Sequence, residues 1–558
     1  MIPPQVRIIT LCICFAAPGL AVPDSVTMSG APHIVRNGAA TQLLVQGRPF
    51  LVLGGEVGNS SSSSLEYMRP VWPRLAGLHL NTVLAPVSWE QLEPEEGRFD
   101  FTLVDGLIEG ARASRLHLVF LWFGSWKNMV SSYAPSWVRA DPRRFPLTMD
   151  EAGNWLPIPS TFGENTRAAD ARAFRSLMRH IREVDAAEQT VIMVQVENEI
   201  GLENSSRDRC EAAQAAFAGP VPPALADRLL HHRDELTREL RAAWEAAGAR
   251  TSGSWADIFG AGPLANELFM TWQYARYIDS VAAAGREEYA IPLFVNAAIG
   301  RKDGKLGSYP GGGALPLGFD LWHLAAPHVG LLSPDIYYGS FPGWCAAYAQ
   351  SGNPFFIPET RAGDAGAANA FLAIGQWRAI GFSPFAIDDH PLTEDEFVRA
   401  YGVLEQLSPL ILAHQGDGLM GAAALSQDNP AQVLTLGRYT LNVVLRRQRK
   451  ISWVADHGYV LVIAARADRF IVAGKDVEVT FAANGAQPAV VELGKVEEGT
   501  FVNGNWMPGR RLNGDEIMLD YNLSALAAKN QTGTGLSLKA EGPAILRVDV
   551  FGREPGPK

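Results

Sequence analysis

From Phe50 to His390 the sequence alternates between short apolar segments and segments of helical periodicity. Most of the apolar segments are nearly continuous, a pattern typical of parallel strands that are covered on both faces. Eight strands, each followed by a helix, predict a (β/α)8 TIM barrel. An open doubly wound sheet is the alternative, but it would normally show a glycine-rich turn after an early strand. The predicted strands are Phe50–Gly55, Asn81–Val87, Leu116–Trp122, Thr190–Val196, Leu293–Ala297, Val329–Ile336, Pro354–Pro358 and Phe382–Ile387.

Helical segments separate these strands. One begins at Thr102, which together with Asp105 has the pattern of a capping box. Thr393 and Glu396 are expected to cap another helix, which runs toward Leu412. The segment 202–289 exceeds one crossover and has a middle rich in Ala, Glu and Arg, so we expect a helical insertion there. The whole barrel is predicted to span residues 30–413.

Beyond about Gly416 the pattern changes to short strands separated by clusters of Gly, Asn and Asp. Val433–Leu436, Tyr459–Ala464 and Val477–Phe481 are examples. This texture is typical of an antiparallel β-sandwich, which we predict for residues 416–558. A chain of 558 residues has room for a large barrel and such a smaller domain.

The N-terminus has the composition of a signal peptide. Arg7 is the only charge before Asp24, and an apolar stretch followed by a small-residue site ends at Ala21. We expect cleavage after Ala21, removal of residues 1–21 and a secreted or periplasmic protein, with an uncleaved membrane anchor as the alternative. No later stretch is apolar and long enough to cross a bilayer. Cys210 and Cys345 remain after cleavage, either as one disulfide or as two buried thiols.

The net charge and the motifs of the chain limit the classes of molecule that it is expected to bind. The net charge of −11 and the pI near 5.6 argue against nucleic acid or an anionic membrane surface and suit a neutral substrate. The chain has no Cys/His spacing for zinc, no phosphate loop and no dinucleotide fingerprint, so neither a metal nor a cofactor is expected. Its sequence leaves the oligomeric state open.

Acidic side chains follow two of the predicted strands. The stretch MVQVENEIG places Glu197, Asn198 and Glu199 at the end of the fourth strand, and Glu359 ends the seventh. Catalytic residues of TIM barrels lie at the C-terminal ends of strands. Two opposed carboxyl groups can cleave a glycosidic bond, one as a proton donor and the other as an ionised nucleophile. A separation of about 5 Å would imply retention of configuration, because no water fits between nucleophile and sugar.

The motifs GGEVGNSSSSS, NTVLAPVSWEQLEPEEGRFDF, VQVENEIG and FFIPETRAG resemble those of bacterial glycoside hydrolase family 35 β-galactosidases. The resemblance covers the barrel, and the C-terminal region resembles a β-sandwich attached to one branch of that family. It implies that Glu199 is the acid/base, that Glu359 is the nucleophile and that Asn198 bonds the 2-hydroxyl of the sugar. Glu197 is then a supporting partner. The third strand departs from the family, because it ends in Gly-Ser-Trp-Lys where better-known branches carry a Pro-Gly-Pro-Tyr-type motif followed by an acid.

Further residues are candidates for substrate binding, each with a structural alternative. Glu56 could bind a hydroxyl or be a structural buried acid, and Tyr337 could bond the nucleophile or be an ordinary buried tyrosine. A tryptophan face could stack on a sugar or pack in the core. The tryptophans concerned are Trp89, Trp122, Trp126 and Trp344. Asp388, Asp389 and His390 resemble a metal cluster only superficially, and salt bridges at the barrel rim are expected instead.

Together these observations predict a retaining, exo-acting β-galactosidase that removes terminal β-D-galactosyl residues from neutral oligosaccharides without a cofactor. Two alternatives stay open. One is a retaining β-glycosidase with another sugar specificity, and the other is a non-catalytic carbohydrate-binding protein that has kept the barrel.

Overall fold

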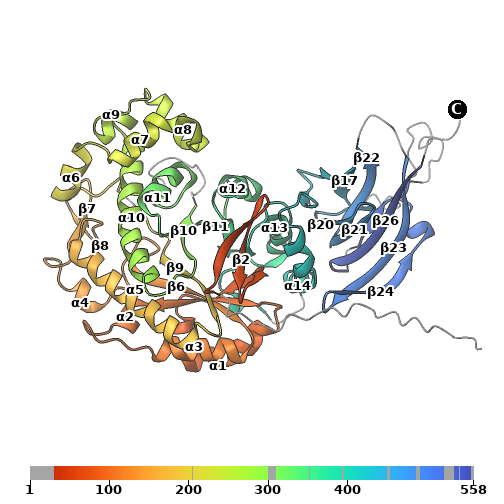
Figure 1. Cartoon of the computed structure of the whole chain (residues 1–558), viewed down its shortest axis with the longest axis horizontal. Coiled ribbons are helices and arrows are strands. Elements are labelled where there is room, and N and C mark those ends of the chain that lie inside the picture. Colours follow the sequence, from red (N-terminus) through yellow and green to blue (C-terminus); the bar gives the residue numbers. More distant parts are fainter. Residues whose placement is uncertain are drawn as a thin grey trace, which may run out of the picture.

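A computed structural model describes residues 30–203, 205–299, 309–350, 352–391, 395–448, 453–484, 490–520, 533–539 and 541–553. The predicted signal peptide, residues 1–21, lies outside this part of the chain. A helix-ringed barrel occupies one side of the molecule and a smaller body of sheets occupies the other (Figure 1). Within the described residues, no helix combines the length and apolarity that a bilayer crossing requires.

A nearly closed parallel sheet forms the barrel, which confirms the predicted fold class. The strand order is β12-β14-β4-β5-β6-β9-β10-β11-β13. The predicted seventh strand is split at Pro358, which has no N–H to donate to a neighbour. The segment before Pro358 pairs with β14, and the segment after it, which lies beyond the predicted bounds, pairs with β11, so the interrupted strand closes the ring. The bounds are β4 (Val52–Glu56), β5 (Thr82–Ser88), β6 (His117–Lys127), β9 (Val191–Asn198), β10 (Leu293–Ala298), β11 (Leu331–Ile336), β12 (Phe356–Ile357), β13 (Glu359–Thr360) and β14 (Gly381–Phe382).

Long helices cover the outside of the barrel. Apolar side chains on one stripe of α3 and of α5 are buried, as their periodicity predicts. The helix α10 packs against α5, so the end of the predicted insertion 202–289 belongs to the barrel ring. The covering helices are α1 (Leu65–Ala76), α3 (Thr102–Ala113), α5 (Glu164–Asp185), α10 (Pro263–Arg286), α11 (Phe319–Ala325), α12 (Phe341–Tyr348), α13 (Gly363–Gly375) and α14 (Glu396–His414). The inserted helices are α6 (Glu211–Ala218), α7 (Pro223–His231), α8 (Arg238–Ala246) and α9 (Trp255–Phe259).

Both predicted helix caps differ in the structure. The helix α3 follows Phe101 without a side-chain cap, and the N–H of Thr102 instead donates to the Asp100 carboxylate at 2.9 Å, so the predicted capping box is wrong. The helix α14 is capped by Asp395, whose carboxylate accepts from the Val398 N–H at 3.0 Å. Thr393 lies outside the described residues.

Strands that the sequence analysis did not predict lie before the barrel and within one of its loops. The strands β1 (His33–Asn37), β2 (Ala40–Val45) and β3 (Arg48–Phe50) form an antiparallel sheet. Leu43 and Val45 of β2 pack with side chains from the barrel interior, such as Phe294, so this sheet closes the N-terminal end of the barrel. A hairpin of β7 (Leu147–Met149) and β8 (Trp155–Pro159) lies in the connection between β6 and α5.

Two antiparallel sheets make up the C-terminal domain, and side chains of both form one apolar cluster that includes Leu441 and Val462. The sheet of six strands also faces the barrel, where the rings of Tyr459 and Phe371 on α13 lie 4.7 Å apart. Its strands are β15 (Met420–Ser426), β20 (His457–Arg466), β21 (Arg469–Lys475), β26 (Ala544–Arg553), β23 (Val490–Val502) and β24 (Asn505–Leu512). The other sheet contains β16 (Ala431–Leu436), β17 (Tyr439–Leu445), β22 (Val477–Ala483) and β25 (Leu536–Leu538).

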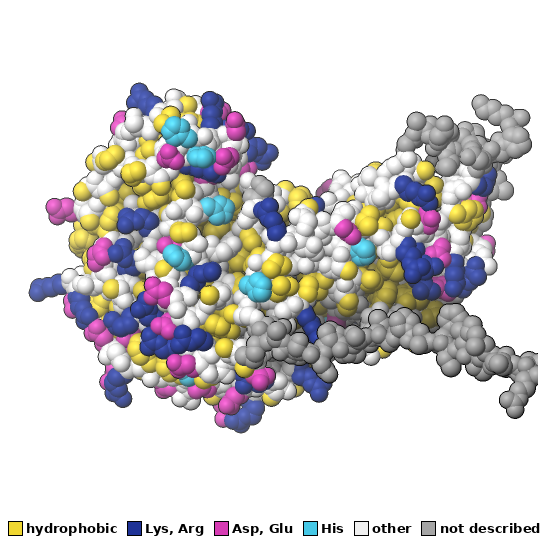
Figure 2. Space-filling view, in the orientation of Figure 1, with side chains coloured by type: hydrophobic (Ala, Val, Ile, Leu, Met, Phe, Trp, Pro, Cys, Tyr) yellow, Lys and Arg dark blue, Asp and Glu magenta, His cyan; other side chains and the backbone are white. Residues whose placement is uncertain are grey.

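The two domains are also joined by a buried polar contact. Lys475 on β21 donates to the Glu396 carboxylate of α14 at 2.6 Å, and the Tyr459 hydroxyl donates to the same carboxylate. Acidic and basic side chains are interspersed over the visible face of the barrel (Figure 2).

Candidate active site

Four acidic side chains from separate strands are buried at one end of the barrel. Glu56 ends β4, Glu199 follows β9, Asp335 lies in β11 and Glu359 begins β13. One carboxylate oxygen from each of Glu199, Asp335 and Glu359 lies within 4.8 Å of the other two. The structure therefore brings together the two acids that the sequence analysis predicted as catalytic, and it adds Asp335, to which that analysis gave no role.

The backbone turns sharply where it presents Glu199. Glu197 and Glu199 both have left-handed φ angles, +61° and +41°. The pairing between β6 and β9 shifts in register at the same place, from Trp122 opposite Val196 to Lys127 opposite Asn198. Non-glycine residues in this region carry strain of about 1–3 kcal/mol each, and such strain concentrates at functional sites. The N–H of Glu199 donates to the Asn296 side chain at 2.9 Å, which fixes the turn.

Glu359 is held by a tyrosine. The Tyr337 hydroxyl donates to Oε1 of Glu359 at 2.7 Å, as the sequence analysis proposed for Tyr337. The Arg361 guanidinium lies over the rings of Tyr337 and Tyr338, at 5.5 and 5.7 Å. Burial and the nearby Glu199 raise the pKa of Glu359 to about 7, although the charge of Lys127 and the Tyr337 hydrogen bond oppose this rise.

Lys127 is a site residue that sequence reasoning noticed only as a departure from a motif. Its side chain is 4% exposed, and its ammonium group donates to Oδ1 of Asn198 at 2.9 Å and to Asn128. The positive charge lowers the pKa of both Glu56 and Glu359. Lys127 therefore orients the amide predicted to bind substrate and offsets negative charge in the site. A lysine ending a barrel strand was the available signal.

Several buried polar atoms of the site have no hydrogen-bond partner among the described residues. Most buried polar groups in proteins are paired, so a group of open ones is informative. Sugar hydroxyls both donate and accept hydrogen bonds, and could satisfy all of them. These atoms are Oε1 of Glu56, Nδ2 of Asn198, Oδ1 of Asp335 and Oε2 of Glu359. Burial, followed by the charge of Glu359, holds the pKa of Glu56 well above its usual range.

Three predicted stacking tryptophans are core residues. Trp89, Trp122 and Trp126 are each 0% exposed. Trp89 donates to Glu93 at 2.8 Å and Trp122 donates to Asp170 at 2.9 Å. This burial favours the core-packing alternative for all three rings, because stacking needs an accessible face, and their contact with sugar stays a prediction.

Other aromatic rings pack against Trp126 and Trp344. Trp126 packs edge-on against Tyr274 and Tyr277, with ring centroids 5.3 and 4.6 Å away. Trp344 is half-buried on α12 with its ring 6.4 Å from that of Tyr348, and its substrate contact stays a prediction.

Glu197 lies in a second acid cluster beside the first. Its two oxygens accept from the N–H groups of Ser125 and Trp126 at 3.1 and 2.8 Å, and its carboxyl group also bonds Asp170. This places Glu197 as a supporting partner, as predicted. Burial and the adjacent Asp170 raise its pKa well above the usual range.

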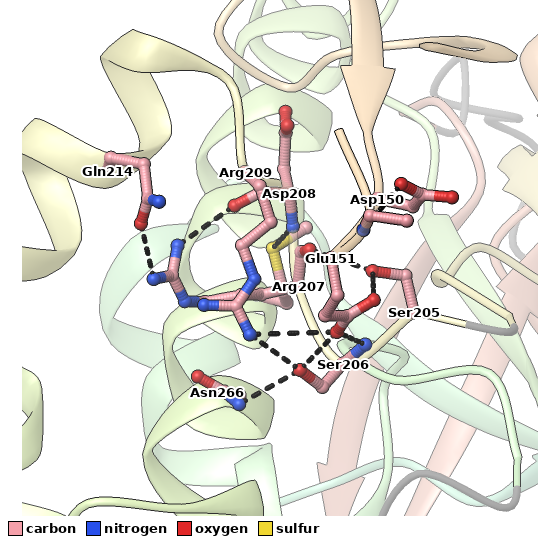
Figure 3. Close-up of polar contacts among 11 residues, drawn as sticks. Asp150, Glu151, Ser205, Ser206, Arg207, Asp208, Arg209, Gln214 and Asn266 are labelled. Carbon is pink, nitrogen blue, oxygen red and sulfur yellow. Dashed lines mark hydrogen bonds and ion pairs between the residues drawn. The ribbon is translucent and has the colours of Figure 1, made fainter. Parts of the chain in front are cut away.

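The loop that follows Glu199 is tied to the β7–β8 hairpin (Figure 3). The Glu151 carboxylate accepts from the N–H and Oγ of Ser206 at 2.7 and 2.6 Å, and from Oγ of Ser205 at 2.7 Å. Arg209 and Asn266 also donate to the Ser206 hydroxyl. Burial opposes ionisation of Glu151, but the serine hydrogen bonds outweigh it and lower its pKa to about 2. Sequence analysis did not anticipate this anchor.

Other candidate groups have structural roles. Asp388 accepts from the Gly58 N–H at 2.8 Å and from Ser61 Oγ at 2.6 Å, and His390 lies 2.9 Å from Asp395. Within the described residues, only Glu199, Asp335 and Glu359 have a spacing that could hold a metal ion. Cys210 and Cys345 are both buried free thiols, which settles the alternative left open by the sequence.

Residues 72–277 match the glycoside hydrolase family 42 model, described as Beta-galactosidase. The matched segment contains the stretch ending in Asn198 and Glu199 but not Glu359. Residues 397–524 match a model described as Domain of unknown function (DUF5597). Among curated proteins no sequence matches this chain. The match indicates a β-galactosidase-like glycoside hydrolase barrel, and family 42 is indicated in place of the predicted family 35.

Several solved structures match this chain at low similarity. The β-galactosidase from the psychrophilic Marinomonas ef1 is 14% identical over 66% of this chain and 60% of its own, with a TM-score of 0.42. That from Bacillus circulans sp. alkalophilus is 16% identical over 65% of this chain and 57% of its own, with a TM-score of 0.45. The catalytic domain of a β-amylase from Paenibacillus polymyxa is 10% identical over 64% of this chain and 97% of its own, with a TM-score of 0.44. The chain thus spans about 60% of the two β-galactosidases, and these likenesses carry no argument about function.

Proposed function

We propose that this protein is a retaining, exo-acting β-galactosidase that hydrolyses terminal β-D-galactosyl residues of neutral glycosides. The observation that carries the proposal is the approach of Glu199 and Glu359, whose nearest oxygens lie within 4.8 Å. Retaining enzymes hold their two carboxyl groups about 5–5.5 Å apart, whereas inverting enzymes leave about 6.5–9.5 Å for a water molecule. The family match over residues 72–277 supports the galactosidase assignment.

In the first step Glu359 attacks the anomeric carbon while Glu199 donates its proton to the departing oxygen. The glycosidic bond breaks and an ester bond forms between Glu359 and the sugar. In the second step Glu199, now ionised, takes a proton from water, which attacks the same carbon and releases Glu359 as a carboxylate. The Nδ2 of Asn198, which has no protein partner, donates to the 2-hydroxyl and Lys127 fixes its orientation.

Lys127 and Tyr337 serve the nucleophile in this scheme. A buried carboxylate needs stabilisation to be ionised in the resting enzyme. The Lys127 charge and the hydrogen bond from Tyr337 both favour the ionised form of Glu359. Burial of the whole site strengthens these interactions relative to water.

A second candidate is a retaining β-glycosidase with another sugar preference. The observation that favours it is Lys127, a buried cation where the better-known β-galactosidases are expected to present an acid. A panel of aryl β-glycosides would separate the candidates, because only the matching sugar should give efficient turnover. Preference for galactosides by at least tenfold supports the first candidate.

The roles of the two acids are tested by trapping and rescue. A 2-fluoro galactoside should label Glu359, which peptide mass spectrometry would show. Azide should restore turnover to Glu359→Ala with an α-glycosyl azide as product, and to Glu199→Ala with the β-azide. Wild-type rates in Glu359→Ala, or azide products of the opposite anomeric configuration, would overturn the assignment.

The predicted signal peptide supports a secreted or periplasmic location, which we include in the proposal. Fractionation of cells producing the full-length chain would test it, and a mature N-terminus after Ala21 is the expected result.

A further inference from the structure

The site contains more buried carboxyl groups than the proposed mechanism uses. Glu56, Glu199, Asp335 and Glu359 are 1%, 9%, 1% and 6% exposed. Lys127 is the cation whose charge acts on two of them, Glu56 and Glu359. One ammonium group can balance one carboxylate, and additional buried charge would be strongly unfavourable. Some of these acids must therefore carry protons.

Asp335 is positioned to contact both catalytic acids. Its Oδ2 accepts from Nδ2 of Asn296 at 2.7 Å, and Oδ1 of the same amide accepts from the Glu199 N–H at 2.9 Å. Asp335 also lies directly opposite Glu359 in the pairing of β11 with β13. One of its oxygens is within 4.8 Å of both Glu199 and Glu359. Its Oδ1 is buried without a protein partner.

The surroundings of Asp335 favour its neutral form. Burial, then the charges of Glu359, Glu199 and Glu56, and finally a hydrogen bond with Glu199 hold the pKa of Asp335 well above its usual range. Two tyrosines also interact with the charge of Asp335, Tyr348 at the end of α12 and Tyr337 after β11.

Resting on the proposed function, we propose that Asp335 is a positioning residue that stays protonated and donates its hydrogen bond to whichever catalytic acid is ionised. In the resting site that acid is Glu359, and the Asp335 hydroxyl turns to it from its contact with Glu199, because Oδ1 of Asp335 and Oε2 of Glu359 are both without a partner in the structure. Once Glu359 forms the ester and Glu199 has given up its proton, the negative charge resides on Glu199. The Asp335 hydroxyl then turns to Glu199, and it returns to Glu359 when water has released the sugar. Asp335 itself neither gains nor loses a proton in the cycle.

Two substitutions separate a neutral donor from a charged group. Asp335→Asn keeps a neutral donor and an oxygen for Asn296, so kcat/KM should stay within about threefold of wild type. Asp335→Ala removes the donor, so kcat/KM should fall about 10- to 100-fold, the effect of losing a hydrogen bond to a charged group. The acidic limb of its pH profile should also move to higher pH, because ionised Glu359 loses a donor. A purely structural role would lower stability without moving that limb.

Infrared spectroscopy supplies a readout that does not depend on turnover. At pH 7 the difference spectrum between wild type and Asp335→Asn should show loss of a protonated carboxyl band. The matched control is Asp320→Asn, because Asp320 is 4% exposed but pairs with Arg228 on another element. That variant should lose a carboxylate band instead.

The outcomes discriminate between the two proposals. Loss of a carboxylate band in Asp335→Asn, or equal activity losses in the Asn and Ala variants, would overturn the role of Asp335. Activation of wild type by Mn²⁺ or Ca²⁺ that Asp335→Asn abolishes would also overturn it, because a metal ligand must be ionised. Loss of a protonated carboxyl band in Asp335→Asn without hydrolysis of any β-glycoside by wild type would refute the proposed function but would support a protonated Asp335.

Discussion

Two clusters of buried acids lie side by side in this barrel, and they differ in how many of their carboxyl oxygens have hydrogen-bond partners in the protein. In one, Asp170 and Glu197 are hydrogen-bonded to each other, and donors surround both. Asp170 accepts from Trp122, Ser125 and Tyr277, and Glu197 accepts from two backbone N–H groups. In the other, Glu56, Asp335 and Glu359 each keep one oxygen without a protein partner.

Burial alone therefore does not mark a functional acid. Both clusters are buried and both contain carboxyl groups with raised pKa values. What separates them is the number of unsatisfied polar atoms. We call the cluster of Asp170 and Glu197 closed, because its oxygens have protein partners, and the cluster of Glu56, Asp335 and Glu359 open. A closed network stabilises the fold and specifies its packing, whereas an open network costs stability that a bound ligand can restore. Substitution should consequently have opposite effects on stability in the two clusters.

The largest effect is expected for Glu359→Gln. Loss of the nucleophile should reduce kcat on the order of 10⁴-fold or more, yet the variant should be more stable than wild type at pH 8. Glu359 has a folded pKa of about 7 and an ordinary value of 4.5, so the folded protein binds more protons between these values. Stability therefore falls as pH rises through this window. The neutral amide avoids that cost, a gain of about 2–3 kcal/mol in unfolding free energy above pH 7.

Urea unfolding at pH 8 and pH 4 would measure this gain, which should vanish at the lower pH. The same comparison with Asn198→Ala controls for loss of substrate binding without loss of a charge. If Glu359→Gln were less stable than wild type at pH 8, this would contradict the view that ionised Glu359 lowers the stability of the folded protein.

The closed cluster should respond in the opposite direction. Asp170→Ala leaves the Trp122 N–H buried without its acceptor and removes the acceptor shared by the Ser125 and Tyr277 hydroxyls, which keep only their bond to each other. Removing one side of a buried polar network costs about 3–5 kcal/mol of unfolding free energy. Thermal and urea unfolding would report it. A loss below about 1 kcal/mol would show that water replaces the carboxylate, and the contrast between the clusters would disappear.

A smaller effect is expected where one protein donor serves the open cluster. Tyr337→Phe removes the hydroxyl that donates to Glu359 at 2.7 Å. Hydrogen bonds to charged groups are worth about 1.5–3 kcal/mol, so kcat/KM should fall about 10- to 100-fold. The acidic limb of the pH profile should also move to higher pH, because this bond favours the ionised form of Glu359. A uniform loss at every pH would show that Tyr337 positions the backbone instead.

Periodicity was sufficient to predict the barrel, because apolar runs of strand length alternate with helical stripes over most of the chain. It also placed Glu199 and Glu359 at strand ends, where a barrel gathers its functional side chains. It could not give the sheet β1–β3 or the break at Pro358, which depend on contacts between distant segments. The helix caps were assigned from residue type alone, and at α3 the tertiary structure uses Asp100 instead.

Site residues beyond the two acids were harder to predict for a physical reason. A tryptophan at a strand end has the same local sequence whether its ring faces a sugar or the core, and Trp89 and Trp122 face the core. The sequence stretch containing Asp335 reads as an ordinary apolar strand, so nothing marked its carboxyl group as unsatisfied. Lys127 stood out only as an unexpected cation, and its bond to Asn198 depends on the register shift between β6 and β9.

The smallest effect is expected outside both clusters, at the contact of Glu151 with Ser205 and Ser206. Glu151→Gln weakens the serine contacts that tie the loop after Glu199 to the β7–β8 hairpin. The folded pKa of about 2 lies below the ordinary value of 4.5, so Glu151 contributes stability above pH 4.5, and this contribution is lost as pH falls toward 2. The side chain is 43% exposed, and solvent screening limits the contribution to less than about 1 kcal/mol. Urea unfolding should thus show a small loss at pH 7 and none near pH 2.5, whereas equal losses at both would mean that the contact depends on shape and not on charge.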